Sequence, residues 1–228
     1  MNRSSLGRTL IGAALTVLLS TVALTPASAA SAPVVSWQTT IIEGGSYLYG
    51  QVPSAVCTAT VDLAPVPCVV DGYADTVGVH TLTALVDGMP ATPTISYTVT
   101  AWTLKGFGKP VRMTSVNKVK AGSTVPFKFK VYEGATKVKS AGVVASFTAQ
   151  RYDCSTLAAI GTASPVTSTK KGFTLKYRDG AFHQNWKTPK LAKAAKVKGK
   201  KPAAASVCYA VTLTTKDAST LTASFLLK

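Results

Sequence analysis

The 228-residue sequence contains few groups suited to acid–base or metal chemistry: nine residues are Asp or Glu and two are His. General acid–base catalysis usually relies on these side chains, and glycoside hydrolysis needs two carboxylates about 5–10 Å apart. The sequence also lacks a glycine-rich phosphate loop and the nucleophile elbow of serine hydrolases. His80 and His183 alternate with their neighbours as ordinary strand residues. We therefore predict that the protein is not an enzyme and uses no cofactor.

Basic residues are missing from one long stretch of the chain. No Lys or Arg occurs from Ala30 to Ala101, where five acids give a net charge of −5. From Trp102 to Lys228, 23 Lys and Arg oppose four acids, which gives a net charge of +19. This asymmetry indicates two units with different electrostatics. We therefore predict one module over residues 30–101 and a second over residues 102–228.

Long apolar runs are also scarce, and the one candidate lies at the N-terminus. Leu10 to Leu24 follows Arg3 and Arg8 and precedes the small residues of segment 27–29. This order is typical of a secretory signal peptide, and the run is short for a membrane span, which needs about 20 residues. An uncleaved anchor is the alternative. We expect cleavage after Ala29, and a mature chain that is secreted, without a transmembrane segment, and either free or associated with the cell surface.

The four cysteines all follow this segment: Cys57, Cys68, Cys154 and Cys208. An even number of cysteines in an exported protein indicates disulfides, and four cysteines allow three pairings. We favour Cys57–Cys68 and Cys154–Cys208, because each pair then stays inside one predicted module. In the loop-closure model these bonds contribute about 3 and about 4 kcal/mol. The absence of C-x-x-C spacing and of nearby histidines argues against zinc, and we predict no metal site.

Strand-like alternation of apolar and polar residues recurs along the chain, most clearly in segments 94–100, 125–132 and 220–227. Period two with one polar face is typical of half-solvated antiparallel sheets. Asp179-Gly180, between two alternating segments, predicts a hairpin. The sequence therefore predicts an all-β protein with two consecutive antiparallel β-sandwich (Ig-like) modules after the signal peptide.

Segment 187–202 departs from this pattern, because it is rich in Ala and Lys and contains no acid. We expect a solvated loop between two strands. The alternative is a contact surface for anionic polymers, with Lys109, Arg112, Lys118, Lys120, Lys128 and Lys130 in support. The candidate contact residues of the segment are its seven lysines: Lys187, Lys190, Lys193, Lys196, Lys198, Lys200 and Lys201.

Several motifs of the basic half resemble the PxKF module of secreted proteins from high-GC Gram-positive bacteria. The most specific block is Val119 to Phe129, and further matches are Trp102 to Phe107, Phe182 to Thr188 and Leu221 to Phe225. Cys68 to Ala84 is similar to the Ig-like repeats that often precede such modules. The resemblance implies an extracellular β-sandwich array without established activity. Family members usually have a shorter connection in place of segment 187–202.

These observations support two interpretations of function. The first is a secreted, non-enzymatic structural or adhesive β-sandwich protein whose ligand the sequence does not identify. The second is an electrostatic binder of anionic cell-envelope polymers or acidic glycans through the lysine-rich C-terminal module. Partners would be envelope polymers or surface proteins, and nucleic acid is not expected. The oligomeric state stays open.

Overall fold

The computed structural model describes residues 31–167, 175–191 and 206–228. The predicted signal peptide and five of the candidate lysines, at positions 193, 196, 198, 200 and 201, lie outside these residues. Residues Pro33–Lys228 group into one compact unit. Across the described residues, the only helical element is the single 3-10 turn Ala141–Val143, and no helix is long and apolar enough to cross a membrane.

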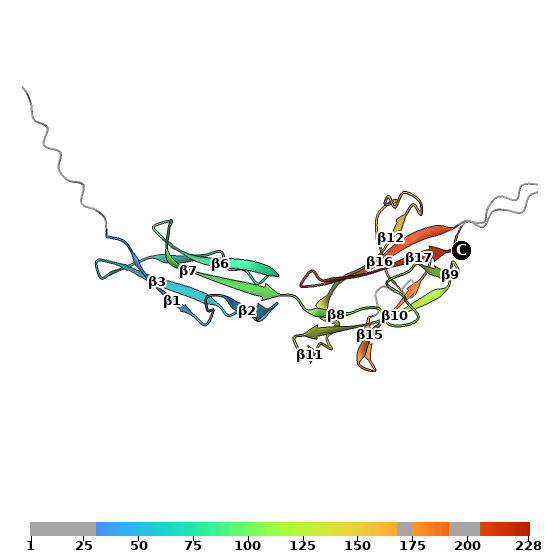
Figure 1. Ribbon diagram of the computed structural model, residues 1–228, viewed down its shortest axis with the longest axis horizontal. Coiled ribbons are helices and arrows are strands. Elements are labelled where there is room, and N and C mark those ends of the chain that lie inside the picture. The colour runs from blue at the N-terminus through green and yellow to red at the C-terminus, as the bar shows by residue number, and fades with distance from the viewer. Residues whose placement is uncertain (1–30, 168–174, 192–205) are drawn as a thin grey trace, which may run out of the picture. The chain divides into compact units, whose positions relative to one another are not determined.

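Seven strands form two sheets between residues 34 and 100 (Figure 1). The first sheet has the order β1-β3-β4 and the second β2-β7-β6-β5. No sheet combines strands from both sides of Ala101 within the described part of the chain; the domain boundary itself stays a prediction. The strands are β1 Val34–Thr39, β2 Gly45–Leu48, β3 Ala55–Val61, β4 Ala64–Val66, β5 Cys68–Asp71, β6 Gly78–Val86 and β7 Met89–Thr100.

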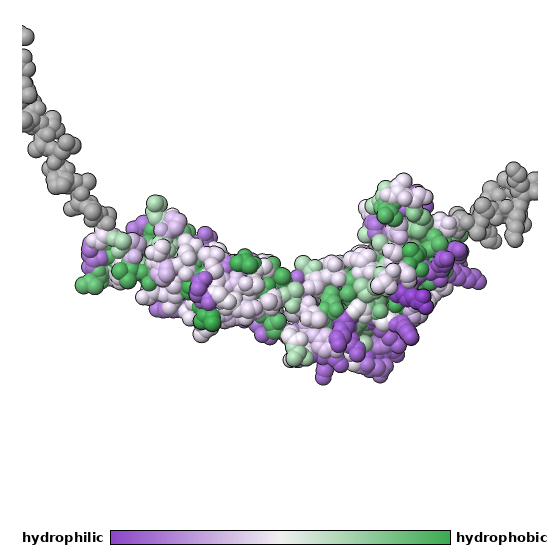
Figure 2. Space-filling model, viewed as in Figure 1, coloured by the Kyte–Doolittle hydropathy of each residue, from purple (hydrophilic) through white to green (hydrophobic). Residues whose placement is uncertain are grey.

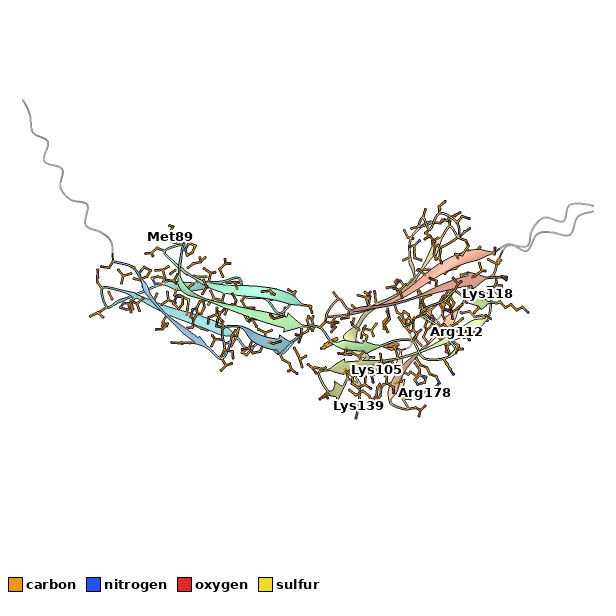
Figure 3. The ribbon with its side chains drawn as sticks, in the orientation of Figure 1. Met89, Lys105, Arg112, Lys118, Lys139 and Arg178 are labelled. Atoms are coloured by element: carbon orange, nitrogen blue, oxygen red, sulfur yellow. A yellow bond between two sulfur atoms is a disulfide. The ribbon has the colours of Figure 1, made fainter. Side chains whose placement is uncertain are left out.

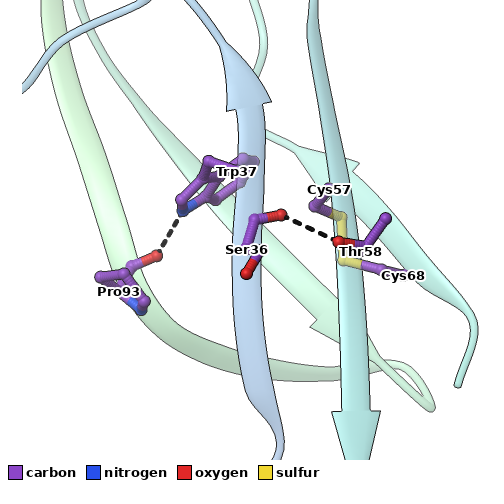
Figure 4. The surroundings of a disulfide bond; sticks show 6 residues. All are labelled: Ser36, Trp37, Cys57, Thr58, Cys68 and Pro93. Atoms are coloured by element: carbon purple, nitrogen blue, oxygen red, sulfur yellow. Dashed lines mark hydrogen bonds between the residues drawn. A yellow bond between two sulfur atoms is a disulfide. The ribbon is translucent and has the colours of Figure 1, made fainter. Parts of the chain in front are cut away.

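We call these two sheets the N-terminal sandwich. Two buried clusters fill the space between them, one of small apolar side chains and one that includes Leu82 and Tyr97. Ala59 on β3 packs in one buried cluster with Ala84 and Val86 on β6. The Cys57–Cys68 disulfide links β3 to β5 and so joins the two sheets covalently (Figure 4). The Trp37 indole on β1 also donates a hydrogen bond of 2.8 Å to the Pro93 carbonyl on β7. The two sheets are therefore held face to face by packing and by bonds between them.

Ten further strands form the C-terminal sandwich. One sheet has the order β11-β10-β15-β14, with β8 also paired to β10, and the other has the order β13-β12-β16-β17-β9. The strands are β8 Thr103–Lys105, β9 Asn117–Val119, β10 Thr124–Glu133, β11 Thr136–Lys137, β12 Val144–Tyr152, β13 Ser164–Pro165, β14 Lys176–Arg178, β15 Ala181–Lys187, β16 Val207–Thr215 and β17 Thr220–Leu227.

The core of the C-terminal sandwich is aromatic. Phe127 and Phe129 point inward from β10 and are 0% and 1% exposed. The Phe127 ring lies 5.1 Å from the Phe147 ring on β12 and 5.7 Å from the Phe225 ring on β17. Edge-to-face pairs of this kind stabilise the contact between the two sheets, both by burying apolar area and by the favourable orientation of the rings. The two phenylalanines therefore face the core, whereas Lys128 between them faces solvent.

The predicted all-β class with antiparallel sheets is confirmed, and so is the strand at residues 220–227. The structure contains both disulfides of the favoured pairing. Two strand pairs differ from expectation, because β2–β7 and β9–β17 are parallel. Alternation reports which face a residue occupies and not the direction of its partner strand, so the sequence pattern could not reveal these pairs.

Three hairpins close through two-residue turns in which both central residues have positive φ. Asp87-Gly88 and Asp179-Gly180 have φ values of 50° and 76°, and of 50° and 72°. These are the residues that type I′ turns favour, and the hairpin predicted at Asp179-Gly180 is confirmed. The third turn, Asp62-Leu63, has φ values of 49° and 65°. Leu63 is an unfavourable residue there, because its Cβ crowds the backbone in the left-handed region.

Asp217 ties the beginning of the C-terminal sandwich to the β16–β17 hairpin. Its side chain is 4% exposed and accepts hydrogen bonds from the Trp102 amide at 2.6 Å and the Ser219 hydroxyl at 2.7 Å. The Thr215 hydroxyl also donates to it. Burial opposes ionisation of this carboxyl, but the hydrogen bonds outweigh it and hold the pKa of Asp217 below its ordinary value.

Replacing Leu63 with Gly should stabilise the protein. The side chain is 94% exposed, so little packing is lost, while the strain of the left-handed conformation is relieved. We expect the free energy of unfolding to rise by about 0.5–1 kcal/mol, measured by urea denaturation. A Leu63→Val variant, β-branched and unsuited to positive φ, should be less stable than the parent; equal stability of all three proteins would contradict this account.

Asp217→Asn should destabilise the protein by about 1–3 kcal/mol at pH 7, because the hydrogen bonds to a charged acceptor are weakened. The folded pKa is depressed, so this stability is present above about pH 4 and is lost as pH falls through the folded pKa. Urea denaturation at pH 7 and at pH 3 should therefore show a smaller difference between parent and variant at pH 3. An equal difference at both pH values would exclude ionisation as the cause.

Candidate anion-binding face

Strand β10 places aromatic side chains in the core and cationic side chains on the outer surface. Lys128 is exposed and Lys130 half-exposed, whereas their neighbours Phe127 and Phe129 are buried. This arrangement follows from the period of two along a strand. One strand thus contributes both to the core and to a charged outer surface.

The pairing register brings further cations beside these two lysines. Lys105 on β8 lies directly opposite Lys130, and Lys128 is in a row with His183 on β15 and Lys176 on β14. Tyr132 lies in the same face, with the Lys105 ammonium 5.3 Å from its ring centroid. We call this surface the basic face. It consists of Lys105, Lys128, Lys130, Lys137, Lys176, Arg178, His183 and Lys187.

The space-filling view shows hydrophilic side chains gathered over the strands of this sheet (Figure 2). Lys105 and Arg178, from β8 and β14, are labelled with the side chains in Figure 3. These two residues belong to strands that do not pair with each other, and β10 and β15 lie between them in the sheet. The cations therefore extend across the sheet and are not confined to one strand.

A groove of about 360 Å³ crosses the basic face over β10. The Gly108 amide donates to the Lys128 carbonyl at 2.7 Å, which continues the pairing of β8 with β10 beyond the end of β8. Strands β8 and β10 contribute three lysines to the groove lining, and the β14–β15 hairpin contributes one carboxylate and one imidazole. The lining residues are Lys105, Gly106, Gly108, Lys128, Phe129, Lys130, Asp179, Ala181 and His183.

Both histidines are anchored to backbone carbonyl groups. The His183 Nε2 donates to the Arg178 carbonyl at 3.2 Å, and the His80 Nε2 donates to the Thr76 carbonyl at 2.6 Å. Because a carbonyl only accepts, each Nε2 atom bears a proton and donates it to the carbonyl group. His80 also packs 5.5 Å from the Tyr97 ring in the N-terminal sandwich. His183, in contrast, lines the groove.

The outer face of the opposite sheet has a different character. On β12, β16 and β17, Thr148, Thr212 and Thr222 form one row across three strands. The neighbouring rows contain Ser146, Thr214 and Thr220, and then Gln150, Ala210 and Ser224. All nine of these register positions are uncharged. Seven Lys and Arg side chains of the C-terminal sandwich thus share one outer face, whereas these nine central positions of the opposite outer face hold none.

The structure distributes the candidate lysines over different surfaces. Lys187 and Lys190 are exposed, and Lys187 belongs to the basic face opposite Thr124. The supporting residues Lys128 and Lys130 lie in that face, but Lys118 is on β9 in the opposite sheet. Sequence reasoning missed Lys105, Lys137, Lys176 and Arg178. Their only signal was alternation within strands of two or three residues, which is too short to recognise.

The described residues contain no group of three or more His, Cys, Asp or Glu that could hold a metal ion. The cysteines are all paired in disulfides. The chemistry of the basic face and its groove is therefore that of ammonium, guanidinium and imidazole groups beside one carboxylate. Such groups bind anions by charge and hydrogen bonding.

Comparisons with protein-family models and with curated protein sequences gave no match. The resemblance to the PxKF module thus stays a prediction. Among solved structures, the chain is similar to the fibronectin(III)-like modules of Clostridium thermocellum CbhA, with 15% identity, 85% of this chain and 93% of that chain covered, and a TM-score of 0.26.

Two other similar structures also contain tandem domains. An I-band fragment of titin has 12% identity, with 88% of this chain and 66% of that chain covered and a TM-score of 0.27. The three N-terminal domains of the bacteriophage RB49 outer capsid protein Hoc have 13% identity, with 86% and 70% covered and a TM-score of 0.27. The β-sandwich assignment rests on the sheets and cores described above.

Replacing Lys130 with Glu should increase stability, because it exchanges a like-charge pair with Lys105 for an opposite-charge pair. Directly opposed charges on neighbouring strands contribute about 0.2–1 kcal/mol, so we expect the free energy of unfolding to rise by about 0.5 kcal/mol at low salt. Urea denaturation in 1 M salt, where the Debye length is about 3 Å, should remove most of this gain.

The matched control for this experiment is Lys216→Glu, which makes the same charge change at an exposed lysine outside the basic face. A gain as large in the control would show that only the net charge matters. A loss of stability in Lys130→Glu would contradict the repulsion between Lys105 and Lys130.

Proposed function

We propose that this chain is an extracellular, non-catalytic β-sandwich protein that attaches to anionic polymers of the cell envelope through its basic face. β-Sandwich folds of this kind are typical of extracellular structural and adhesive modules, and the structure shows such a fold. The proposal adds to this general class a ligand type and a surface. It combines the adhesive and the electrostatic interpretations of the sequence.

The location is supported by two independent features of the chain. The N-terminal segment has the charge, apolar run and small residues of a secretory signal peptide. Both cysteine pairs form disulfides, and structural disulfides persist mainly in oxidising compartments outside the cytoplasm. The resemblance to secreted PxKF proteins supports the same location. Secretion therefore forms part of the proposal.

The observation on which the proposal depends is the segregation of charge between the two outer faces of the C-terminal sandwich. Lys105 opposite Lys130 is a repulsive arrangement that costs stability, whereas the nine central outward positions of β12, β16 and β17 are uncharged. Lysines that serve only solubility would not need to be gathered on one sheet. A surface that attracts a polyanion needs its charges close together, because their potentials then add.

A salt-gradient elution experiment tests this assignment. A Gln variant at Lys105, Lys128, Lys130 and Lys176 removes four cations of the basic face. We expect it to elute from an immobilised polyphosphate matrix at a much lower salt concentration than the parent, because fewer counterions are displaced on binding. The far-UV circular dichroism spectrum and the melting temperature should change little, since these side chains are outside the core.

The matched control replaces four exposed lysines outside the basic face with Gln: Lys118, Lys120, Lys139 and Lys216. It should elute close to the parent. Equal shifts in both variants would show that net charge alone controls retention. A large shift only when Lys193, Lys196, Lys198, Lys200 and Lys201 are replaced would place the contact in segment 187–202. Retention of the parent that resists high salt would instead favour adhesion to a defined protein or glycan.

A further inference from the structure

The groove on the basic face is lined by both cationic and anionic side chains, a combination that a uniformly anionic ligand would not need. Lys105, Lys128 and Lys130 contribute three cations to its lining. Asp179 contributes a carboxylate on the β14–β15 turn, and His183 contributes an imidazole. A ligand with negative charge along its whole length would be attracted by the lysines and repelled by Asp179.

We infer that this groove takes a repeat unit in which a phosphate group is joined to a hydroxyl-bearing polyol or sugar. The inference rests on the proposed function and names the ligand of the same surface. The phosphate would lie against the lysines, and a hydroxyl group of the same unit would donate a hydrogen bond to Asp179. The ligand class is thus a polyol- or sugar-phosphate polymer.

The lysines suit a phosphate group in number and position. Lys105 and Lys130 are directly opposite each other, so their Cβ atoms are about 4.5–5.5 Å apart and both ammonium groups can approach one anion. Lys128 is two residues from Lys130 on the same face. A phosphodiester offers two strongly accepting oxygens, and a lysine ammonium is a donor without acceptor capacity.

The groove lining also presents a hydrogen-bond acceptor. An ionised Asp179 only accepts hydrogen bonds, and its side chain is exposed. His183 uses its Nε2 proton for the Arg178 carbonyl, so this proton is not available to a ligand. A hydroxyl is a neutral donor that can satisfy the Asp179 carboxylate. The surroundings of Asp179 in the groove therefore suit the polyol part of the repeat and not its phosphate.

The size of the groove fits a short ligand segment. Small-molecule sites are typically about 300–1,000 Å³ in volume, and this groove is at the lower end with about 360 Å³. One phosphate with its attached polyol fits such a space, whereas the remaining cations of the basic face lie outside the groove lining. The rest of the polymer would therefore contact Lys137, Lys176 and Lys187 by charge alone.

Two synthetic probes of equal charge and spacing separate the hydroxyl contribution from the charge contribution. The first is a glycerol-phosphate hexamer, and the second is a hexamer of 1,3-propanediol phosphate, which lacks the free hydroxyl. We expect the parent protein to bind the first probe about fivefold more tightly, which corresponds to the net contribution of about 1 kcal/mol of a typical hydrogen bond. Isothermal titration calorimetry at low salt measures both affinities.

The decisive variant is Asp179→Gly, because glycine keeps the positive φ of the turn and removes the acceptor. We expect this variant to bind both probes equally and the propanediol probe more tightly than the parent does, since a repulsive charge is gone. Asp179→Asn, which also tolerates the turn, is the second variant if the first does not fold. The matched control Asp153→Asn removes one negative charge outside the groove lining and should keep the fivefold preference.

The outcomes distinguish this inference from the proposed function. If the parent binds both probes with equal affinity, or if Asp179→Gly retains the preference, Asp179 does not recognise a hydroxyl and the inference is wrong, while binding of both probes still supports a polyanion-binding face. If the parent binds neither probe at low salt, the proposed function fails as well.

Discussion

The alternation of side chains along β10 is the constraint on which the rest of the C-terminal sandwich depends. Phe127 and Phe129 are buried in contact with aromatic rings of the facing sheet, which fixes the orientation of the strand. Because side chains alternate strictly, Lys128 and Lys130 must then point outward. A shift of β10 by one residue would bury the lysines and expose the phenylalanines, so core packing and surface charge are determined together.

The pairing register of neighbouring strands aligns their outward basic residues with those of β10, and together these residues form one surface. Strands β8, β14 and β15 each place basic residues at positions that align with the outward lysines of β10. Because the buried side of β15 includes Phe182 and Trp186, its register is held by the same aromatic core. The electrostatic face is thus a consequence of hydrophobic packing, although it opposes stability through repulsion between like charges.

Much of the fold could be predicted from the sequence, because it depends on local patterns. Alternation identified the strand at residues 220–227, turn chemistry identified the hairpin at Asp179-Gly180, and the separation of charge led to the favoured cysteine pairs. The candidate site could be predicted only in part. Lys128 and Lys130 stood in a clear strand pattern, but their juxtaposition with Lys105 depends on pairing between strands about 25 residues apart in sequence.

The many lysines of segment 187–202 are conspicuous in the sequence, but their number does not predict how they are arranged in space. The basic face has few lysines on each strand, and strand pairing arranges them on one surface. Similarly, Asp179 was recognised as a turn residue, and its place in the groove became visible only when the β14–β15 hairpin was seen beside β10. The positive φ of Leu63 could not be predicted, because leucine disfavours this conformation and the neighbouring residues do not indicate it.

The most direct measurement is the perturbation of backbone amide NMR signals on titration with a polyanion such as polyphosphate. The account predicts that perturbations concentrate on β8, β10, β14 and β15, with little change on β12, β16 and β17. Perturbations confined to segment 187–202, or spread evenly over both sheets of the C-terminal sandwich, would contradict the claim that one sheet face is the binding surface.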